Sequence, residues 1–398
     1  MSDLVIFFLL FAAVAIGWFL GRRSPASPLA LSSYFTGRRA ALDPPADIAN
    51  DPLLDDLPEN VGGTQLRLAQ GVRLRRRGEV AGAVRIHQDL LAGAGLPADD
   101  AAQAQLELAR DYISAGLLDR AEELLLALVQ DFPRQRQAAR RHLLEVYEIE
   151  RDWRRAIEVA RGMLPHKLLR QGNSLEAPPE RGQRAARLLA HYCCELAGEE
   201  RIAGNLQAAR RLLLEALFRD PQCVRASLVL AQVEFDAGRY RQAATALRRV
   251  RGQDADYLPE TVDMLRKCYA ALGDGKSLRE YLLESLAARP TPALVATVAE
   301  DMAQVEGDAV AADFLAQQLP GHPSLGGLLR LMGLQSAASR GAHQADIRLL
   351  EGLTQRLLAS RPAYRCGHCG FAGKHLHWHC PGCKQWGSIK AVGGSDTP

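Results

Sequence analysis

Small and apolar residues recur through residues 61–362 with the spacing of amphipathic helices, and the pattern repeats about every 34 residues. In each repeat a turn residue, usually Gly, precedes a small residue by five positions, and a mostly apolar residue follows four positions later. This spacing is kept at Gly78/Ala83/His87, Gly116/Ala121/Leu125, Gly204/Ala209/Leu213, Gly238/Ala243/Leu247 and Gly307/Ala312/Ala316, and with one substitution at Arg151/Ala156/Ala160 and Gly273/Leu278/Leu282.

Each part of this pattern has a physical role in a pair of packed helices. Gly permits the turn between the helices, and the small residue lets the second helix approach the first closely. Pro133, Pro221 and Pro290 each follow a unit and prevent its second helix from continuing. The period and positions are those of the tetratricopeptide repeat. They predict an all-α fold, a right-handed superhelical solenoid whose concave surface binds peptides or proteins.

Two stretches depart from the regular period. A poorer last unit covers residues 326–360, and the proline-containing stretch 166–182 predicts an inserted loop. Cys193 and Cys194 are adjacent in a predicted helix, so we expect buried thiols that face different directions. Most tyrosines of the repeats fall at packing positions and are expected in the core: Tyr112, Tyr147, Tyr192 and Tyr269.

An apolar segment without charge, residues 4–20, precedes the repeats and is about 25 Å long as a helix. Trp18 lies near its end, and Arg22 and Arg23 follow directly. A cleaved signal peptide carries its positive charges before the apolar run. The opposite placement predicts a transmembrane anchor over residues 1–23, with the N-terminus outside and the body in the cytoplasm.

Residues 24–60 are rich in Pro and Asp, and each Pro restricts helix formation around it. We interpret this segment as a cytoplasmic linker, with a degenerate first repeat as the alternative.

The C-terminal segment, residues 363–392, contains two Cys-x2-Cys pairs separated by ten residues: Cys366, Cys369, Cys380 and Cys383. Each pair can direct two sulfurs at one ion, and four thiolates suit one zinc or one iron ion. Such a closed site is structural or transfers electrons, and it is not hydrolytic. Because four cysteines complete the coordination shell, we expect that the nearby histidines are not ligands. We also expect two hairpin-like turns, with Phe371, Trp378 and Trp386 packed around them.

Composition narrows the function further. Lys and Arg number 49 against 46 Asp and Glu, for a net charge of +3, so charge gives no case for a nucleic-acid partner. Free cysteines and a thiolate site indicate a reducing compartment. We find no catalytic arrangement of Ser, His and Asp or of paired carboxylates, and therefore predict that the chain is not an enzyme.

Several segments together resemble the lipopolysaccharide assembly protein B family of Gram-negative bacteria: GWFLGRRS (17–24), RGEVAGAVRIHQ (77–88), ARDYISAGLLDRAE (109–122), YRCGHCGF (364–371) and WHCPGC (378–383). The resemblance implies an inner-membrane adaptor that restrains lipopolysaccharide synthesis. It also implies a rubredoxin-type tail with Cys366, Cys369, Cys380 and Cys383 as its ligands.

The same resemblance implies three protein partners. They are a membrane ATP-dependent zinc protease, the lipid A deacetylase that the protease degrades, and a lipopolysaccharide-sensing inner-membrane protein. The residues alone leave two other functions open, a redox or electron-transfer protein and a generic protein-binding scaffold. A zinc-ribbon nucleic-acid binder is disfavoured by the balanced charge.

Overall fold

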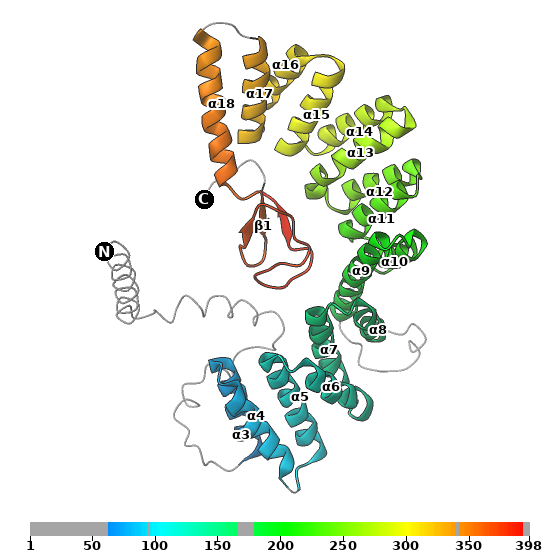
Figure 1. Cartoon of the computed structure of the whole chain (residues 1–398), viewed down its shortest axis with the longest axis vertical. Helices are drawn as coiled ribbons and strands as arrows, with labels where there is room; N and C mark the ends of the chain where they lie inside the picture. The colour runs from blue at the N-terminus through cyan, green and yellow to red at the C-terminus, as the bar shows by residue number, and fades with distance from the viewer. Residues whose placement is uncertain (1–62, 94, 165–178, 339–341, 393–398) are drawn as a thin grey trace, which may run out of the picture.

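The computed structural model describes residues 63–93, 95–164, 179–338 and 342–392. Its helices are packed in pairs that follow one another along a curved row (Figure 1). The pairs are α3 (Thr64–Arg77) and α4 (Val80–Ala92), α5 (Ala98–Ala115) and α6 (Leu118–Asp131), α7 (Arg136–Glu150) and α8 (Trp153–Met163), α9 (Pro179–Ile202) and α10 (Leu206–Arg219), α11 (Val224–Asp236) and α12 (Tyr240–Gln253), α13 (Pro259–Leu272) and α14 (Gly275–Ala288), α15 (Pro292–Val305) and α16 (Asp308–Gln318), and α17 (Leu325–Ala338) and α18 (Ala342–Ser360). This is the helical repeat solenoid that the sequence predicts.

The turn within most pairs needs one residue in the left-handed conformation. Gly116 has φ 76° and Gly238 has φ 72°, and each comes two residues before the second helix of its pair. Arg151 occupies the equivalent position between α7 and α8 and adopts φ 58°. The backbone conformation of the turn is therefore kept even where Gly is replaced.

Small side chains lie where paired helices meet, as predicted. The fully buried alanines include Ala83, Ala121, Ala156, Ala209 and Ala243. The prediction of Ala312 and Ala316 for the later unit is wrong by one residue, because Ala311 and Leu315 are buried instead. Gly307 comes directly before α16, whereas the left-handed residue of the other units comes two residues before the second helix.

The second helix of three pairs ends just before a proline, as predicted. Pro133, Pro221 and Pro290 each lie two residues beyond the last residue of α6, α10 and α14, respectively. Most of the predicted loop, residues 165–178, lies outside the described residues, and α9 already begins at Pro179. The four predicted core tyrosines are buried, and so are both adjacent cysteines: Tyr112, Tyr147, Tyr192, Tyr269, Cys193 and Cys194.

The C-terminal domain is a small sheet on the concave side of the row of helices (Figure 1). Strands β1 (Tyr364–Cys366), β2 (Ala372–Gly373) and β3 (Ile389–Ala391) form an antiparallel sheet in the order β2-β1-β3. Tyr364 pairs with Gly373 on one side and with Ala391 on the other. The expectation of hairpin-like turns alone is therefore wrong, because the strands that flank the turns also pair.

The prediction of a single-pass inner-membrane protein must be corrected. None of the helices in the described ranges is long and apolar enough to cross a membrane. Most of these helices have 11–15 residues, which is too short for a span. The longest, α9, has 24 residues but carries charged side chains from Glu180 to Arg201. The predicted anchor (1–23) and linker (24–60) lie outside the described residues.

Candidate metal centre and its docking site

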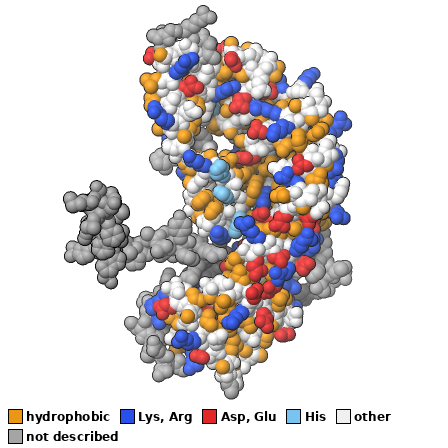
Figure 2. All heavy atoms as spheres, viewed as in Figure 1, with side chains coloured by type: hydrophobic (Ala, Val, Ile, Leu, Met, Phe, Trp, Pro, Cys, Tyr) orange, Lys and Arg blue, Asp and Glu red, His pale blue; other side chains and the backbone are white. Residues whose placement is uncertain are grey.

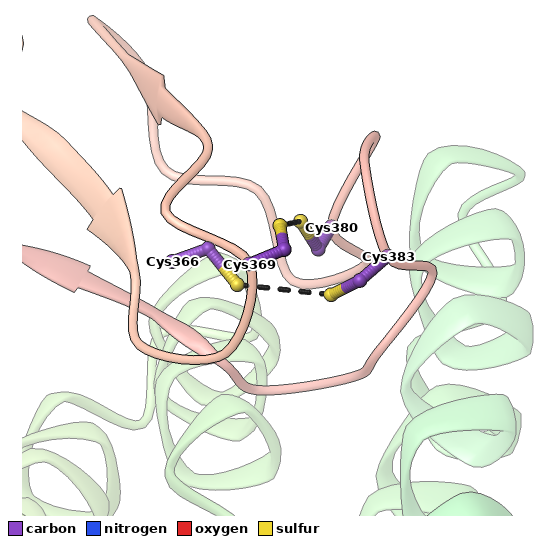
Figure 3. A group of neighbouring side chains, drawn as sticks. All are labelled: Cys366, Cys369, Cys380 and Cys383. Atoms are coloured by element: carbon purple, nitrogen blue, oxygen red, sulfur yellow. Dashed lines mark hydrogen bonds between the residues drawn. The ribbon is translucent and has the colours of Figure 1, made fainter. Parts of the chain in front are cut away.

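The two Cys-x2-Cys segments form tight turns that face each other. In the first, the N–H of Gly370 donates to the carbonyl of Cys366 at 3.1 Å, and Gly370 has φ 77°. In the second, the N–H of Lys384 donates to the carbonyl of Cys380 at 2.9 Å. Each turn therefore presents its two sulfurs on the same side, toward the other turn (Figure 3).

The structure brings the four predicted cysteines together. Their sulfur atoms all lie within 4.8 Å of one another, with 3.8 Å between Cys366 and Cys383 and 3.6 Å between Cys369 and Cys380 (Figure 3). A tetrahedral ion with metal–sulfur bonds of about 2.3 Å needs sulfurs about 3.8 Å apart. The geometry therefore fits one zinc or iron ion, and it does not decide between these two metals.

The histidines near the turns are not part of the group of candidate metal ligands. Among the described residues, the four cysteines are the one cluster that could hold a metal ion. His379 instead places Nε2 at 2.8 Å from the carbonyl of Lys384 and stacks on Trp386. Figure 2 shows the pale blue histidines gathered over the C-terminal domain in the middle of the molecule, with their side chains at the surface.

Burial and hydrogen bonding act in opposite directions on the thiols. Burial raises the pKa of Cys366, but the Ser388 hydroxyl and the N–H groups of Cys369 and His368 outweigh it and lower the pKa to about 6. For Cys383, burial dominates and raises the pKa to about 12. Because metal-bound cysteines are thiolates, a cation among these sulfurs would stabilise the charged form of all four.

Trp386 links the second turn to the repeats. Its ring stacks on His379 and on His191 of α9, with ring centroids 4.5 and 5.1 Å away. The guanidinium of Arg225 lies 5.6 Å from the ring centroid. Trp386 Nε1 donates to Oε1 of Glu148, an atom that also accepts from the Tyr192 hydroxyl at 2.6 Å. We call the contact residues of the repeats the Trp386 site: Glu148, Trp153, His191, Tyr192 and Arg225.

A second set of contacts joins the domain to the segment between α12 and α13. Trp378 stacks on Tyr257 of the short helix η4 (Ala255–Tyr257), with ring centroids 5.3 Å apart. The Tyr257 hydroxyl donates to the carbonyl of Ile389 at 2.8 Å. Lys390 lies 2.7 Å from a carboxylate oxygen of Asp254 and 2.9 Å from one of Asp256. The domain is therefore fixed to the concave face at two separate places.

Sequence reasoning missed this docking. Phe371 packs with the cysteine cluster, as expected. Trp378 and Trp386 are also expected around the turns. The ring of Trp386 does stack on His379 beside the second turn, but both indole rings also contact the repeats. The adjacency of each Trp to a cysteine turn was the available signal, since an indole next to a closed metal site has little core of its own to fill.

These features define a class of protein: a tetratricopeptide-repeat protein with a rubredoxin-type domain at its C-terminus. Residues 364–391 match the family described as "Rubredoxin metal binding domain", and residues 201–268 match "Tetratricopeptide repeat". The chain is 32% identical over 402 residues to lipopolysaccharide assembly protein B of Escherichia coli (strain K12), covering 98% of this chain and 99% of that protein. The chain belongs to the lipopolysaccharide assembly protein B family.

A second relative agrees with this assignment. The Haemophilus influenzae protein of the same name is 31% identical, with 98% of each chain covered. Among solved structures, the assembly chaperone of RpL4 (Acl4) is 16% identical with a TM-score of 0.37, over 63% of this chain and 100% of that one.

Proposed function

We propose that this chain is a non-catalytic adaptor in lipopolysaccharide assembly that binds protein partners on its repeat surface. The name of the Escherichia coli and Haemophilus influenzae relatives, lipopolysaccharide assembly protein B, supports a role in lipopolysaccharide assembly. The observation that carries the adaptor role is the docking of the C-terminal domain on the concave face through Trp386 and Glu148. Two segments far apart in sequence thereby present one composite surface on the concave side, which is the side that repeat proteins use for binding.

We further propose that Cys366, Cys369, Cys380 and Cys383 hold one iron or zinc ion. Their sulfur separations support this assignment. A bound ion with four thiolates supplies a cross-link between the two turns and keeps no open position for substrate. Its contribution to the adaptor is then mechanical, because the turns carry both indole rings that contact the repeats.

Membership of the family supports a proposal for the partners. We propose that the composite surface brings the lipid A deacetylase to an ATP-dependent zinc protease, and that a lipopolysaccharide-sensing protein opposes this step. The test is the half-life of the deacetylase in cells that lack this protein, complemented by wild type, by Trp386→Ala, or by Phe218→Ala as an exposed aromatic control. In cells that lack this protein we expect a prolonged half-life of the deacetylase. Wild type and Phe218→Ala should restore the normal half-life. An unchanged half-life in the deletion strain would refute this role.

One-electron transfer is the second candidate function, and the exposure of Cys369 favours it. An exposed ligand shortens the path between a tetrathiolate iron centre and an external redox partner. The iron-loaded protein would then show a visible absorption that changes reversibly on reduction, whereas a zinc-loaded protein would not.

A further inference from the structure

The last helix of the row, α18, has an apolar face that no described part of the chain covers. Leu349, Leu350, Leu353 and Leu357 are 61, 54, 43 and 54% exposed. At helical spacing these positions fall along one stripe of the surface. Figure 1 places α18 at the outer end of the row, and Figure 2 shows orange side chains among charged ones in that region.

The packing of α18 onto the solenoid does not account for this stripe. The opposite side of the helix faces α17, where Thr354 is buried and Gln344 donates to the carbonyl of Ser336 at 3.1 Å. The terminal helix of a repeat array usually presents a polar outer face, because no further repeat covers it. The exposed leucines are therefore expected to contact another molecule.

Charges of opposite sign lie at the two ends of the stripe. Asp346 is exposed one turn before Leu350, while Arg356 and Arg361 are exposed at the other end. Among the ion pairs of the described residues, none involves these three side chains. The stripe thus has an acidic beginning and a basic end, which become complementary when two such helices run in opposite directions.

We infer that this stripe, which we call the α18 face, binds the α18 face of a second copy of the chain in antiparallel orientation. About a two-fold axis near Leu353, the leucines of the two copies meet. Asp346 of each copy then approaches Arg356 and Arg361 of the other, so every favourable contact is made twice. This inference concerns assembly and is independent of the proposed adaptor role.

A lipid surface fits the α18 face less well. Amphipathic helices that lie on membranes carry mainly Lys and Arg beside the apolar stripe, whereas Asp346 continues this stripe directly. The pairing of opposite ends accounts for both the leucines and the charges. One helix pair buries less surface than most stable dimers, so we expect association at micromolar concentrations.

Sedimentation of the full-length chain across micromolar concentrations tests the leucine contact. We expect wild type to shift from monomer to dimer mass. Leu353→Glu should raise the dissociation constant on the order of a hundredfold or more, since the leucine is lost from both copies. Leu283→Glu, at an exposed leucine of α14, is the matched control and should behave as wild type. A monomer at every concentration, or a dimer that Leu353→Glu leaves intact, overturns the inference.

Charge reversal tests the antiparallel orientation. Asp346→Lys makes both ends of the stripe basic, and Arg356→Glu with Arg361→Glu makes both ends acidic, so each variant alone should remain monomeric. An equimolar mixture should form the heterodimer, because acidic and basic ends again face each other. Circular dichroism and metal content verify that each variant is folded. Failure of the mixture to associate, with both variants folded, overturns the antiparallel pairing.

Discussion

The indole Nε1 of Trp386 lies 3.1 Å from Oε1 of Glu148, although 238 residues separate them in the chain. Glu148 comes from α7 in the middle of the row, and Trp386 follows the second cysteine turn. The same glutamate oxygen accepts from Tyr192 of α9. One carboxylate therefore joins two neighbouring repeats to the C-terminal domain.

Truncation of Trp386 should weaken this docking. Trp386→Ala removes the stacking of the rings and the hydrogen bond to Glu148. We expect the docking of the domain to lose about 2 kcal/mol of stabilising free energy. This is less than the roughly 3–5 kcal/mol that truncation of a fully buried Trp costs. Hydrogen exchange of α9 and β3 should accelerate, since both elements lose a contact. Phe218→Ala, at an exposed ring of α10, should leave the same peptides unchanged. Equal exchange in wild type and Trp386→Ala would mean that other contacts hold the domain.

Much of the repeat architecture could be predicted because each unit uses local rules. Gly238 and Ala243 report a left-handed turn and a close helix approach within one repeat, and these are properties of neighbouring residues. The four-cysteine cluster was predictable for the same reason, since each Cys-x2-Cys turn is local. The docking of Trp386 on Glu148 was not predictable, because it depends on the curvature of the whole row.

Loss of one cysteine should release the whole docked domain. Cys380→Ser removes one of four thiolates, and we expect loss of the ion, because a structural metal supplies much of the folding free energy of so small a domain. Trp378 and Trp386 should then leave the repeats, which predicts a red-shifted tryptophan emission and faster exchange of α9. Helices α5 and α6 serve as the internal control, since repeats contact only their neighbours. Unchanged metal content in this variant would refute the ligand assignment.

His191 should make stability depend on pH. Burial, with further contributions from Arg225 and His379, lowers the pKa of His191 to about 3, against about 6.5 in an unfolded chain. Between these values the unfolded chain binds a proton that the folded chain does not. The stabilisation is therefore complete above pH 6.5 and is lost as the pH falls toward 3, by about 1 kcal/mol per pH unit.

The matched variant for this test is His191→Phe, which keeps a ring against Trp386 without a titrating group. Chemical denaturation at several pH values should show a steeper loss of stability for wild type than for the variant below pH 6.5. Both proteins share the cysteine cluster, so acid loss of metal affects them equally. Parallel curves would show that folding does not lower the pKa of His191.

A buried cluster of charged side chains in the first repeats should be destabilised when the guanidinium of Arg75 is removed. Arg75 lies 2.5 Å from a carboxylate oxygen of Glu107 and 2.6 Å from one of Asp111, and all three side chains are buried. Arg75→Met leaves buried carboxylates without this partner, and we expect a loss of about 3–5 kcal/mol in the unfolding of α3–α5. Arg134→Met, in an exposed pair with Asp99, should cost less than about 1 kcal/mol. Similar losses in both variants would contradict this account.

The turn at Arg151 offers a stabilising substitution. Its φ of 58° costs a residue with a side chain roughly 1–2 kcal/mol, and Gly removes that cost. Part of the gain is offset because Gly also increases the conformational entropy of the unfolded chain, so Arg151→Gly should stabilise by about 0.5–1 kcal/mol.

The reciprocal change, Gly238→Ala, should destabilise by about 1 kcal/mol. A Cβ at Gly238 would meet no atom within 4 Å, so only backbone strain is added. Denaturation midpoints of the two variants should move in opposite directions from that of wild type, and a shift of both in the same direction would contradict the role of the left-handed turn.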